Sequence, residues 1–219
     1  MPLFYYDQPA PEIQLAIWKI EEQEDFFMQL VPLSAAIQHP HKRKQHLAGR
    51  FLLRFLAPDF PLSEIAIADS RKPYLPDDKY HFSISHCGDY AAAIISKSKR
   101  VGIDIEMFDK KVLRIEHKFL NEGERDFLRT EEHRSLELIT TLWCAKEAIF
   151  KWFSFGQVNF KENILLSAFN LKNAGAFNAA FSNKKLHADL KVHYRLFENI
   201  SMTWVSGGEK NIPQFAGYR

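Results

Sequence analysis

The sequence predicts an α+β fold built from two α+β halves within one chain of 219 residues. Two observations favour it over a doubly wound parallel sheet: the expected strands and helices form separate runs, and the strands are joined by turns of hairpin length. In addition, a coarse order of strands and helices occurs twice. We therefore expect an N-terminal half at residues 1–100 and a C-terminal half at residues 101–219.

The N-terminal half is expected to begin with a strand and a short helix, followed by a long amphipathic helix. Residues 12–20 alternate partly in polarity, which indicates a strand, and residues 25–30 favour a short helix. Apolar residues then recur at helical spacing from His41 to Ala57. Pro58 is expected to end this helix, because proline cannot continue the hydrogen-bond pattern.

Strands, helices and strands again are expected in the remainder of the chain. Residues 80–106 predict three short strands, because turn residues at 87–89 and 97–100 divide this stretch into three. Helical patterns dominate residues 112–153. The last third returns to strands, most clearly at 190–197 and 201–205.

Composition and charge limit the class of protein. The chain is 46% hydrophobic and its 29 basic residues nearly cancel 27 acidic ones, so we expect a well-packed core and no nucleic-acid-binding surface. Cys87 and Cys144 lie far apart and form no disulfide framework, which fits a reduced, cytoplasmic setting. The N-terminus lacks the layout of a secretion signal, and no apolar stretch is long enough for a membrane span.

Two acidic residues share one face of a predicted strand. In Val101–Glu106, valine and isoleucine alternate with Asp104 and Glu106, so both carboxylates project from the face opposite the apolar residues. Neighbouring carboxylates repel each other, and a hard divalent cation such as Mg²⁺ is a common reason for a fold to keep them together. The alternative is an ordinary solvated strand face.

A third carboxylate and a lysine lie on one face of a predicted helix. Trp143, Glu147 and Lys151 are spaced four residues apart, so they face the same direction. Glu147 could hold a metal or accept the proton of an attacking hydroxyl, while Lys151 could neutralise a leaving phosphate. The alternative is a surface ion pair between the glutamate and the lysine.

Candidate anion ligands cluster near two predicted turns. Residues 70–73 are Ser-Arg-Lys-Pro, and Ser85 and His86 stand where a strand gives way to a tight turn. Their side chains and the exposed backbone N–H groups could together receive a phosphate. Each of these residues could equally be an ordinary loop or structural residue.

Taken together, the motifs resemble the 4′-phosphopantetheinyl transferase family, in its larger form that activates carrier-protein-dependent synthases. The resemblance covers residues 43–156, including Gly49-Arg50 in the first long helix. Its landmarks occur in the family's order: Arg71-Lys72-Pro73, Phe82-Ser83-Ile84-Ser85-His86, Gly102-Ile103-Asp104-Ile105-Glu106 and Trp143-x-x-Lys146-Glu147-x-x-x-Lys151. Arg71 stands where the family pattern has glycine.

The resemblance implies a fold and an activity. The fold is a monomeric pseudo-dimer, in which two similar α+β halves are related by a pseudo-twofold and the active site lies in the cleft between them. The activity is the Mg²⁺-dependent transfer of 4′-phosphopantetheine from coenzyme A to a serine of an acyl or peptidyl carrier protein, with 3′,5′-ADP as the second product.

The resemblance also implies roles for individual residues. Asp104, Glu106 and Glu147 would ligate Mg²⁺; Glu147 would also accept the serine proton, and Lys151 would steady the departing 3′,5′-ADP. The expected coenzyme A ligands are Arg50, Arg71, Lys72, Pro73, Ser85, His86 and Lys151.

Two other functions use similar residues. A Mg²⁺-dependent nuclease or phosphodiesterase also combines carboxylates with a lysine around a metal, but the nearly neutral charge of the chain argues against it. A module that binds coenzyme A or a carrier protein without catalysis would not need Asp104, Glu106, Glu147 and Lys151 together. We therefore expect a transferase.

Overall fold

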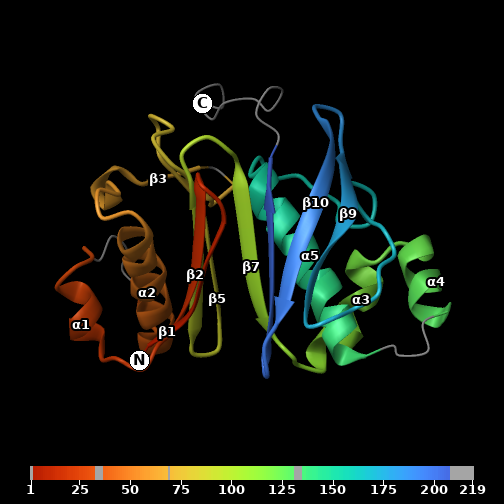
Figure 1. Cartoon of the computed structure of the whole chain (residues 1–219), viewed down its shortest axis with the longest axis horizontal. Coiled ribbons are helices and arrows are strands. Elements are labelled where there is room, and N and C mark those ends of the chain that lie inside the picture. The colour runs from red at the N-terminus through yellow and green to blue at the C-terminus, as the bar shows by residue number, and fades with distance from the viewer. Residues whose placement is uncertain (1, 33–36, 69, 131–134, 208–219) are drawn as a thin grey trace. The chain divides into compact units, whose positions relative to one another are not determined.

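The computed structural model describes residues 2–32, 37–68, 70–130 and 135–207. The described residues divide into two compact units, which we call unit 1 (residues 2–101) and unit 2 (residues 102–207). Each unit contains a β-sheet and one long helix packed on it (Figure 1). The predicted α+β class is therefore confirmed, whereas the similarity of two halves and their pseudo-twofold relation stay predictions.

Unit 1 is built on a four-stranded antiparallel sheet with the order β1-β2-β6-β5. Its strands are β1 Leu3–Ala10, β2 Ile13–Lys19, β5 His81–Cys87 and β6 Tyr90–Ser96. Two helices, α1 Glu24–Met28 and α2 Pro40–Leu56, follow β2. A 3-10 turn at Leu62–Glu64 then leads to a two-stranded hairpin of β3 Ala66–Ile67 and β4 Pro73–Tyr74.

Helix α2 forms the core of unit 1 together with the sheet. Ala48 and Leu52 lie four residues apart on one face of the helix, and with Leu47 and Leu53 they are completely buried in the main apolar cluster. Gly49 allows a close approach to β5, because a Cβ atom at this position would lie 2.6 Å from Cγ2 of Ile84. Neighbouring Arg50 is largely buried.

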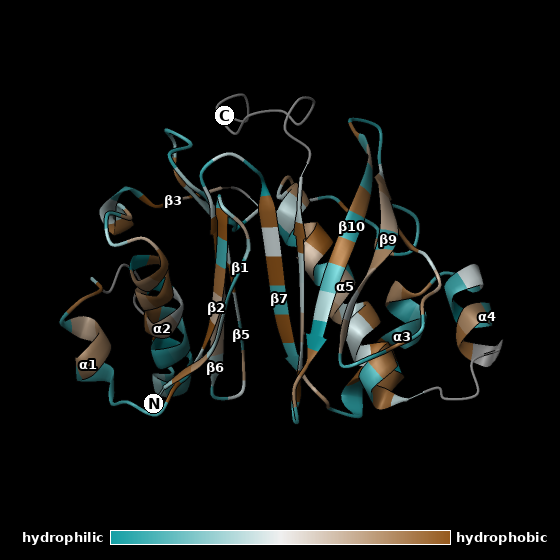
Figure 2. Cartoon of the chain, in the orientation of Figure 1, coloured by the Kyte–Doolittle hydropathy of each residue, from teal (hydrophilic) through white to brown (hydrophobic). Residues whose placement is uncertain are grey.

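Unit 2 is built on a five-stranded sheet with the order β7-β11-β10-β9-β8. Its strands are β7 Val101–Met107, whose first residue ends unit 1, and β8 Ile164–Leu166, β9 Ala174–Ser182, β10 His187–Leu196 and β11 Ile200–Ser206. Its helices are α3 Lys111–Phe119, α4 Glu122–Thr130 and α5 Leu136–Phe153. Most of β7 is coloured as hydrophobic in Figure 2, as expected for a strand buried in a core.

Helix α5 is the central helix of unit 2, and its ends are set by local chemistry. At the start, the Ser135 hydroxyl accepts a hydrogen bond from the Leu138 N–H at 3.1 Å, which caps the helix. At the end, Ser154 turns the chain with a left-handed φ of 73°. Along its length, α5 packs mainly against β11 and α3.

The long helices and the strand pairs of the sequence analysis are present, but five strands were missed. The sequence did not indicate β1, β8 or β9, nor the short strands β3 and β4. In the part of the chain that the structure describes, every helix is too short or too polar to span a lipid bilayer.

Candidate functional site

Strand β7 and helix α5 approach unusually closely at Gly102. A Cβ atom at this position would lie 2.0 Å from the Ala148 carbonyl oxygen and 2.7 Å from the Trp152 nitrogen, so only glycine fits. The side chains at positions 104 and 106 point to the same side of β7 as position 102. The close approach therefore directs both carboxylates toward α5.

Asp104 is paired with Lys151 of α5. The Lys151 Nζ donates to Asp104 Oδ1 at 2.6 Å, and Asp104 is only 3% exposed. A buried carboxylate needs a compensating charge, which the ammonium supplies. The burial of Asp104 rules out the alternative of a solvated strand face for this residue.

Glu106 accepts a hydrogen bond from Trp143 of helix α5. The Trp143 indole N–H donates to Glu106 Oε1 at 3.1 Å. Burial and the charge of Asp104 raise the pKa of Glu106 to about 7, while the Trp143 hydrogen bond and Lys151 oppose this shift. Glu106 therefore titrates near neutral pH.

Glu147 interacts electrostatically with Asp104, Glu106 and Lys151. Burial, followed by the charge of Asp104, raises the pKa of Glu147 to about 7, and Lys151 acts in the opposite direction. Trp143, Glu147 and Lys151 thus all interact with the carboxylates of β7, as their four-residue spacing predicts. A carboxylate that titrates near pH 7 can accept a proton under physiological conditions.

The three carboxylates fit Mg²⁺ in their chemistry. They are hard oxygen donors, and each of the two glutamates has its pKa raised by the charge of Asp104, a repulsion that a cation would relieve. Among the described residues, no three acidic, histidine or cysteine side chains are already grouped as a metal site. The positive charge next to Asp104 is instead the Lys151 ammonium.

In unit 1, Arg50 lies beside His46. The Arg50 guanidinium donates to His46 Nδ1 at 3.0 Å. Burial, followed by the charges of Arg50 and His86, lowers the pKa of His46 to about 4, so His46 is neutral at physiological pH. The predicted Arg50 and His86 therefore both act on His46. Ser85, which precedes His86 on β5, is buried.

A second basic group surrounds a cavity of about 20 Å³ in unit 1. Lys72 and Pro73 line it together with Asp78, His81 and Arg100. Burial lowers the pKa of His81, the charge of Asp78 opposes this shift, and the charges of Arg100 and Lys72 add to it. Arg71 is exposed and has a φ of 65°, a left-handed conformation that explains the glycine of the family pattern at this position.

The sequence analysis did not assign four residues that belong to these groups. His46 lies one helical turn before Arg50, so its position could have been noticed from the i, i+4 spacing. His81 and Arg100 are far apart in sequence from Lys72 and offered no such signal. Lys146, adjacent to Glu147, is completely buried and is described further below.

The comparisons with known proteins agree with the motifs. A family model described as the 4′-phosphopantetheinyl transferase superfamily matches residues 100–205, which contain the β7 carboxylates and α5. The chain is 34% identical over 117 residues to "Enterobactin synthase component D" of Salmonella typhi, an alignment that covers 52% of this chain and 49% of the relative.

Two further relatives point to the same family. "Putative 4′-phosphopantetheinyl transferase" of Haemophilus influenzae is 33% identical over 128 residues, covering 55% of this chain and 54% of the relative. "4′-phosphopantetheinyl transferase AcpT" of Escherichia coli O157:H7 is 26% identical over 167 residues, covering 74% of each chain. The chain spans about half the length of the Salmonella and Haemophilus relatives.

Proposed function

We propose that this chain, whose residues 100–205 match the family model of the 4′-phosphopantetheinyl transferase superfamily, transfers 4′-phosphopantetheine from coenzyme A to a serine of an apo acyl or peptidyl carrier protein. The products would be holo carrier protein and 3′,5′-ADP. The observation that carries this proposal is the group formed by Asp104, Glu106, Glu147 and Lys151, which lies within the matched residues.

We propose that Asp104, Glu106 and Glu147 hold Mg²⁺ next to the diphosphate of coenzyme A. The bound ion would neutralise charge on the diphosphate and polarise the reacting phosphorus. In its absence, Lys151 already compensates the charge of Asp104. The mutual repulsion of the carboxylates supports this assignment, since it weakens when a cation binds.

Glu147 and Lys151 would act on the reacting groups. A pKa of about 7 suits Glu147 to accept the proton of the carrier serine, directly or through a water, as the serine oxygen attacks the β-phosphate. The Lys151 ammonium would stabilise the negative charge that develops on departing 3′,5′-ADP. These two roles use side chains one helical turn apart on α5.

The residues of unit 1 would bind the nucleotide end of coenzyme A. Arg50, Ser85 and His86 would contact the 3′-phosphate, and Arg71, Lys72 and Pro73 would lie along the nucleotide. The cationic side chains in and around these groups support the proposal, because an anionic ligand would compensate their charge. We further propose that the protein acts as a cytoplasmic monomer.

The direct test is a mass assay. The protein is incubated with coenzyme A, Mg²⁺ and a panel of apo carrier proteins, and we expect the mass of a carrier to increase by one phosphopantetheine. Asp104→Ala should abolish the increase while the protein stays folded, because the Lys151 ammonium that loses this partner still interacts with Glu106 and Glu147, and their mutual repulsion with Asp104 is relieved. Asp189→Ala, which changes an exposed carboxylate of β10, serves as the control and should behave as wild type.

The outcomes separate the candidate functions. An unchanged mass with every carrier, or cleavage of DNA in the same buffer, would contradict the transferase. Full activity of Asp104→Ala would remove this residue from the active site.

A further inference from the structure

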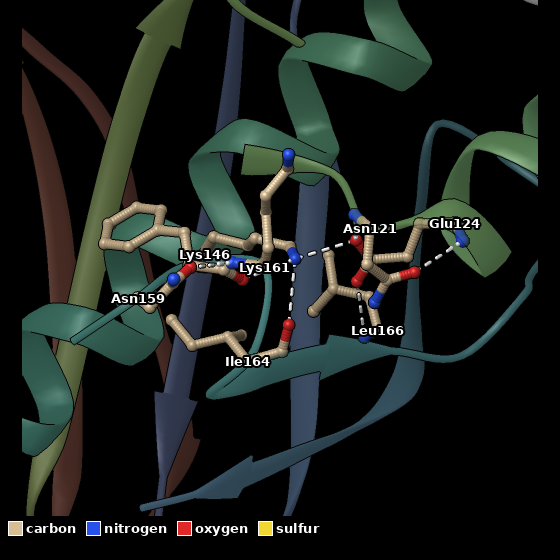
Figure 3. Close-up of polar contacts among 8 residues, drawn as sticks. Asn121, Glu124, Lys146, Asn159, Lys161, Ile164 and Leu166 are labelled. Carbon is tan, nitrogen blue, oxygen red and sulfur yellow. Dashed lines mark hydrogen bonds and ion pairs between the residues drawn. The ribbon is translucent and has the colours of Figure 1, made fainter. Parts of the chain in front are cut away.

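Lys146 is a lysine that is completely buried in unit 2. Its Nζ donates three hydrogen bonds, each of 2.8 Å: to Glu124 Oε2, to the Phe160 carbonyl and to the Ile164 carbonyl (Figure 3). An ammonium group has three protons, so these contacts use its full donor capacity. Burial lowers the pKa of Lys146, and the charge of Glu124 opposes this shift.

Glu124 connects the buried lysine to α4 and β8. Its Oε2 also accepts from the Asn121 N–H at 2.9 Å, and its Oε1 accepts from the Leu166 N–H at 2.9 Å (Figure 3). The side chain of Asn121 in turn accepts from the Glu124 N–H, which caps the start of α4. A buried ion pair contributes little net stability by itself, but its many directional contacts fix neighbouring elements in one arrangement.

The hydrogen bond from Lys146 fixes the backbone of Phe160, which lies in a segment without helix or strand. Residues 154–163 join α5 to β8, and the carbonyl of Phe160 is one of the three Lys146 partners. The Phe160 ring contacts Trp143 at a centroid distance of 5.7 Å, and Phe119 contacts Trp143 at 5.0 Å. Two rings from different elements therefore restrict the orientation of the indole.

The orientation of the indole matters because its N–H donates to Glu106 Oε1. A glutamate has three rotatable side-chain bonds, so a fixed donor limits the positions that its carboxylate can adopt. Residues that orient a metal ligand through a hydrogen bond commonly change metal affinity by about 10-fold to 100-fold when they are substituted.

We infer that Trp143 is a positioning residue for Glu106, and that Lys146 positions Trp143 through the carbonyl and ring of Phe160. The inference rests on the proposed function, in which Glu106 is a Mg²⁺ ligand. Neither Trp143 nor Lys146 contacts the ion or the substrate in this scheme.

The decisive experiment is Trp143→Phe, which keeps an aromatic ring and removes the N–H donor. We would measure Mg²⁺ binding by calorimetry on the protein saturated with coenzyme A, together with kcat and KM of carrier modification. We expect Mg²⁺ to bind about 10-fold more weakly. The coenzyme A affinity in EDTA should stay within about twofold of wild type, because the nucleotide end is bound elsewhere.

The matched control is Trp204→Phe. Trp204 is a tryptophan of unit 2 that stacks on His193 at a centroid distance of 5.3 Å. Its substitution should leave Mg²⁺ affinity at the wild-type value, so that a general loss of packing can be distinguished from loss of the Glu106 contact.

The role of Lys146 is tested by Lys146→Met, alone and combined with Trp143→Phe. We expect Lys146→Met to weaken Mg²⁺ binding, and the double variant to bind no more weakly than Trp143→Phe alone, because both changes act through one contact. If Lys146→Met does not fold, the double variant Glu124→Gln/Lys146→Met is measured in its place, because it removes both buried charges.

The outcomes distinguish this inference from the proposed function. Wild-type Mg²⁺ affinity in Trp143→Phe, with an active wild-type enzyme, would overturn the inference alone. A wild-type protein that neither binds Mg²⁺ with coenzyme A nor modifies a carrier would overturn both. A lower melting temperature of Lys146→Met with unchanged Mg²⁺ affinity would contradict the role of Lys146.

Discussion

At the scale of single residues, the acidic group of unit 2 combines burial with like charge. Asp104, Glu106 and Glu147 could be selected from the sequence, because strand alternation and helical spacing reveal which side chains share a face. The contact between Trp143 and Glu106 could not, since it joins residues 37 positions apart. The burial of Lys146 could have been noticed, because the residues three and four positions away, Leu142, Trp143, Ile149 and Phe150, are all apolar, but its partners are distant in sequence.

The raised pKa of Glu147 predicts a pH-dependent stability. Its folded-state pKa of about 7 lies above the unfolded value of 4.5, so the folded state binds more protons between these values. The free energy of unfolding therefore falls as the pH rises through this window. In EDTA, we expect Glu147→Gln to be more stable than wild type at pH 8, by on the order of 2 kcal/mol, with the difference shrinking toward pH 5.

Urea unfolding at several pH values measures this effect. Glu162→Gln, which changes an exposed glutamate of the same unit, is the control and should follow the wild-type curve. A Glu147→Gln variant that is less stable than wild type at pH 8 would show that the carboxylate is not destabilising in its charged form.

At the scale of elements, strong apolar periodicity made α2, α5 and the strands β5 to β7 predictable. The missed strands lack this signal. Strand β9, Ala174–Ser182, contains several alanines, a glycine and an asparagine, which have low strand propensity, and it is stabilised by its pairing with β10 and β8. Strand β8 is only three residues long, and its place at the sheet edge depends on long-range contacts.

The close approach of β7 and α5 predicts that Gly102 cannot be replaced. In Gly102→Ala, the new methyl group would collide with the Ala148 carbonyl, so the strand and helix must separate. We expect a loss of about 1–3 kcal/mol or more in the free energy of unfolding. Carrier modification should fall by at least about 10-fold, because the carboxylates of β7 move away from Glu147 and Lys151.

The matched control for this prediction is Gly123→Ala in α4. A Cβ atom there would have an ordinary contact of 3.6 Å with the Asn121 side chain. Stability should stay equal or rise slightly, since alanine has the higher helix propensity. Equal stability of Gly102→Ala and wild type in denaturant unfolding would show that α5 has room to move.

At the scale of the whole molecule, the sequence predicted the α+β class but did not reveal the local groups of charge within each unit. Overall composition and charge limit the class of ligand only broadly, since the net charge of +2 hides local groups of one sign. Unit 1 contains basic groups around Arg50 and Lys72, and unit 2 contains the acidic group. Opposite local charges of this kind fit a ligand that is anionic itself and is bound together with a cation.

If both units bind the same coenzyme A molecule, a substitution in unit 1 must weaken ligand-dependent protection in unit 2. A ligand at 100 times its Kd stabilises the folded state by about 2.7 kcal/mol, and a 10-fold loss of affinity removes about 1.4 kcal/mol of this at fixed ligand concentration. His86 is exposed, so His86→Ala should leave the fold intact while it removes a proposed phosphate ligand. Hydrogen exchange of β7 and α5, with Mg²⁺ and increasing coenzyme A, should show half-maximal protection at about 10-fold higher concentration in this variant. His187→Ala, which changes an exposed histidine of β10, should follow wild type, whereas identical titrations for His86→Ala and wild type would exclude His86 from the ligand that unit 2 binds.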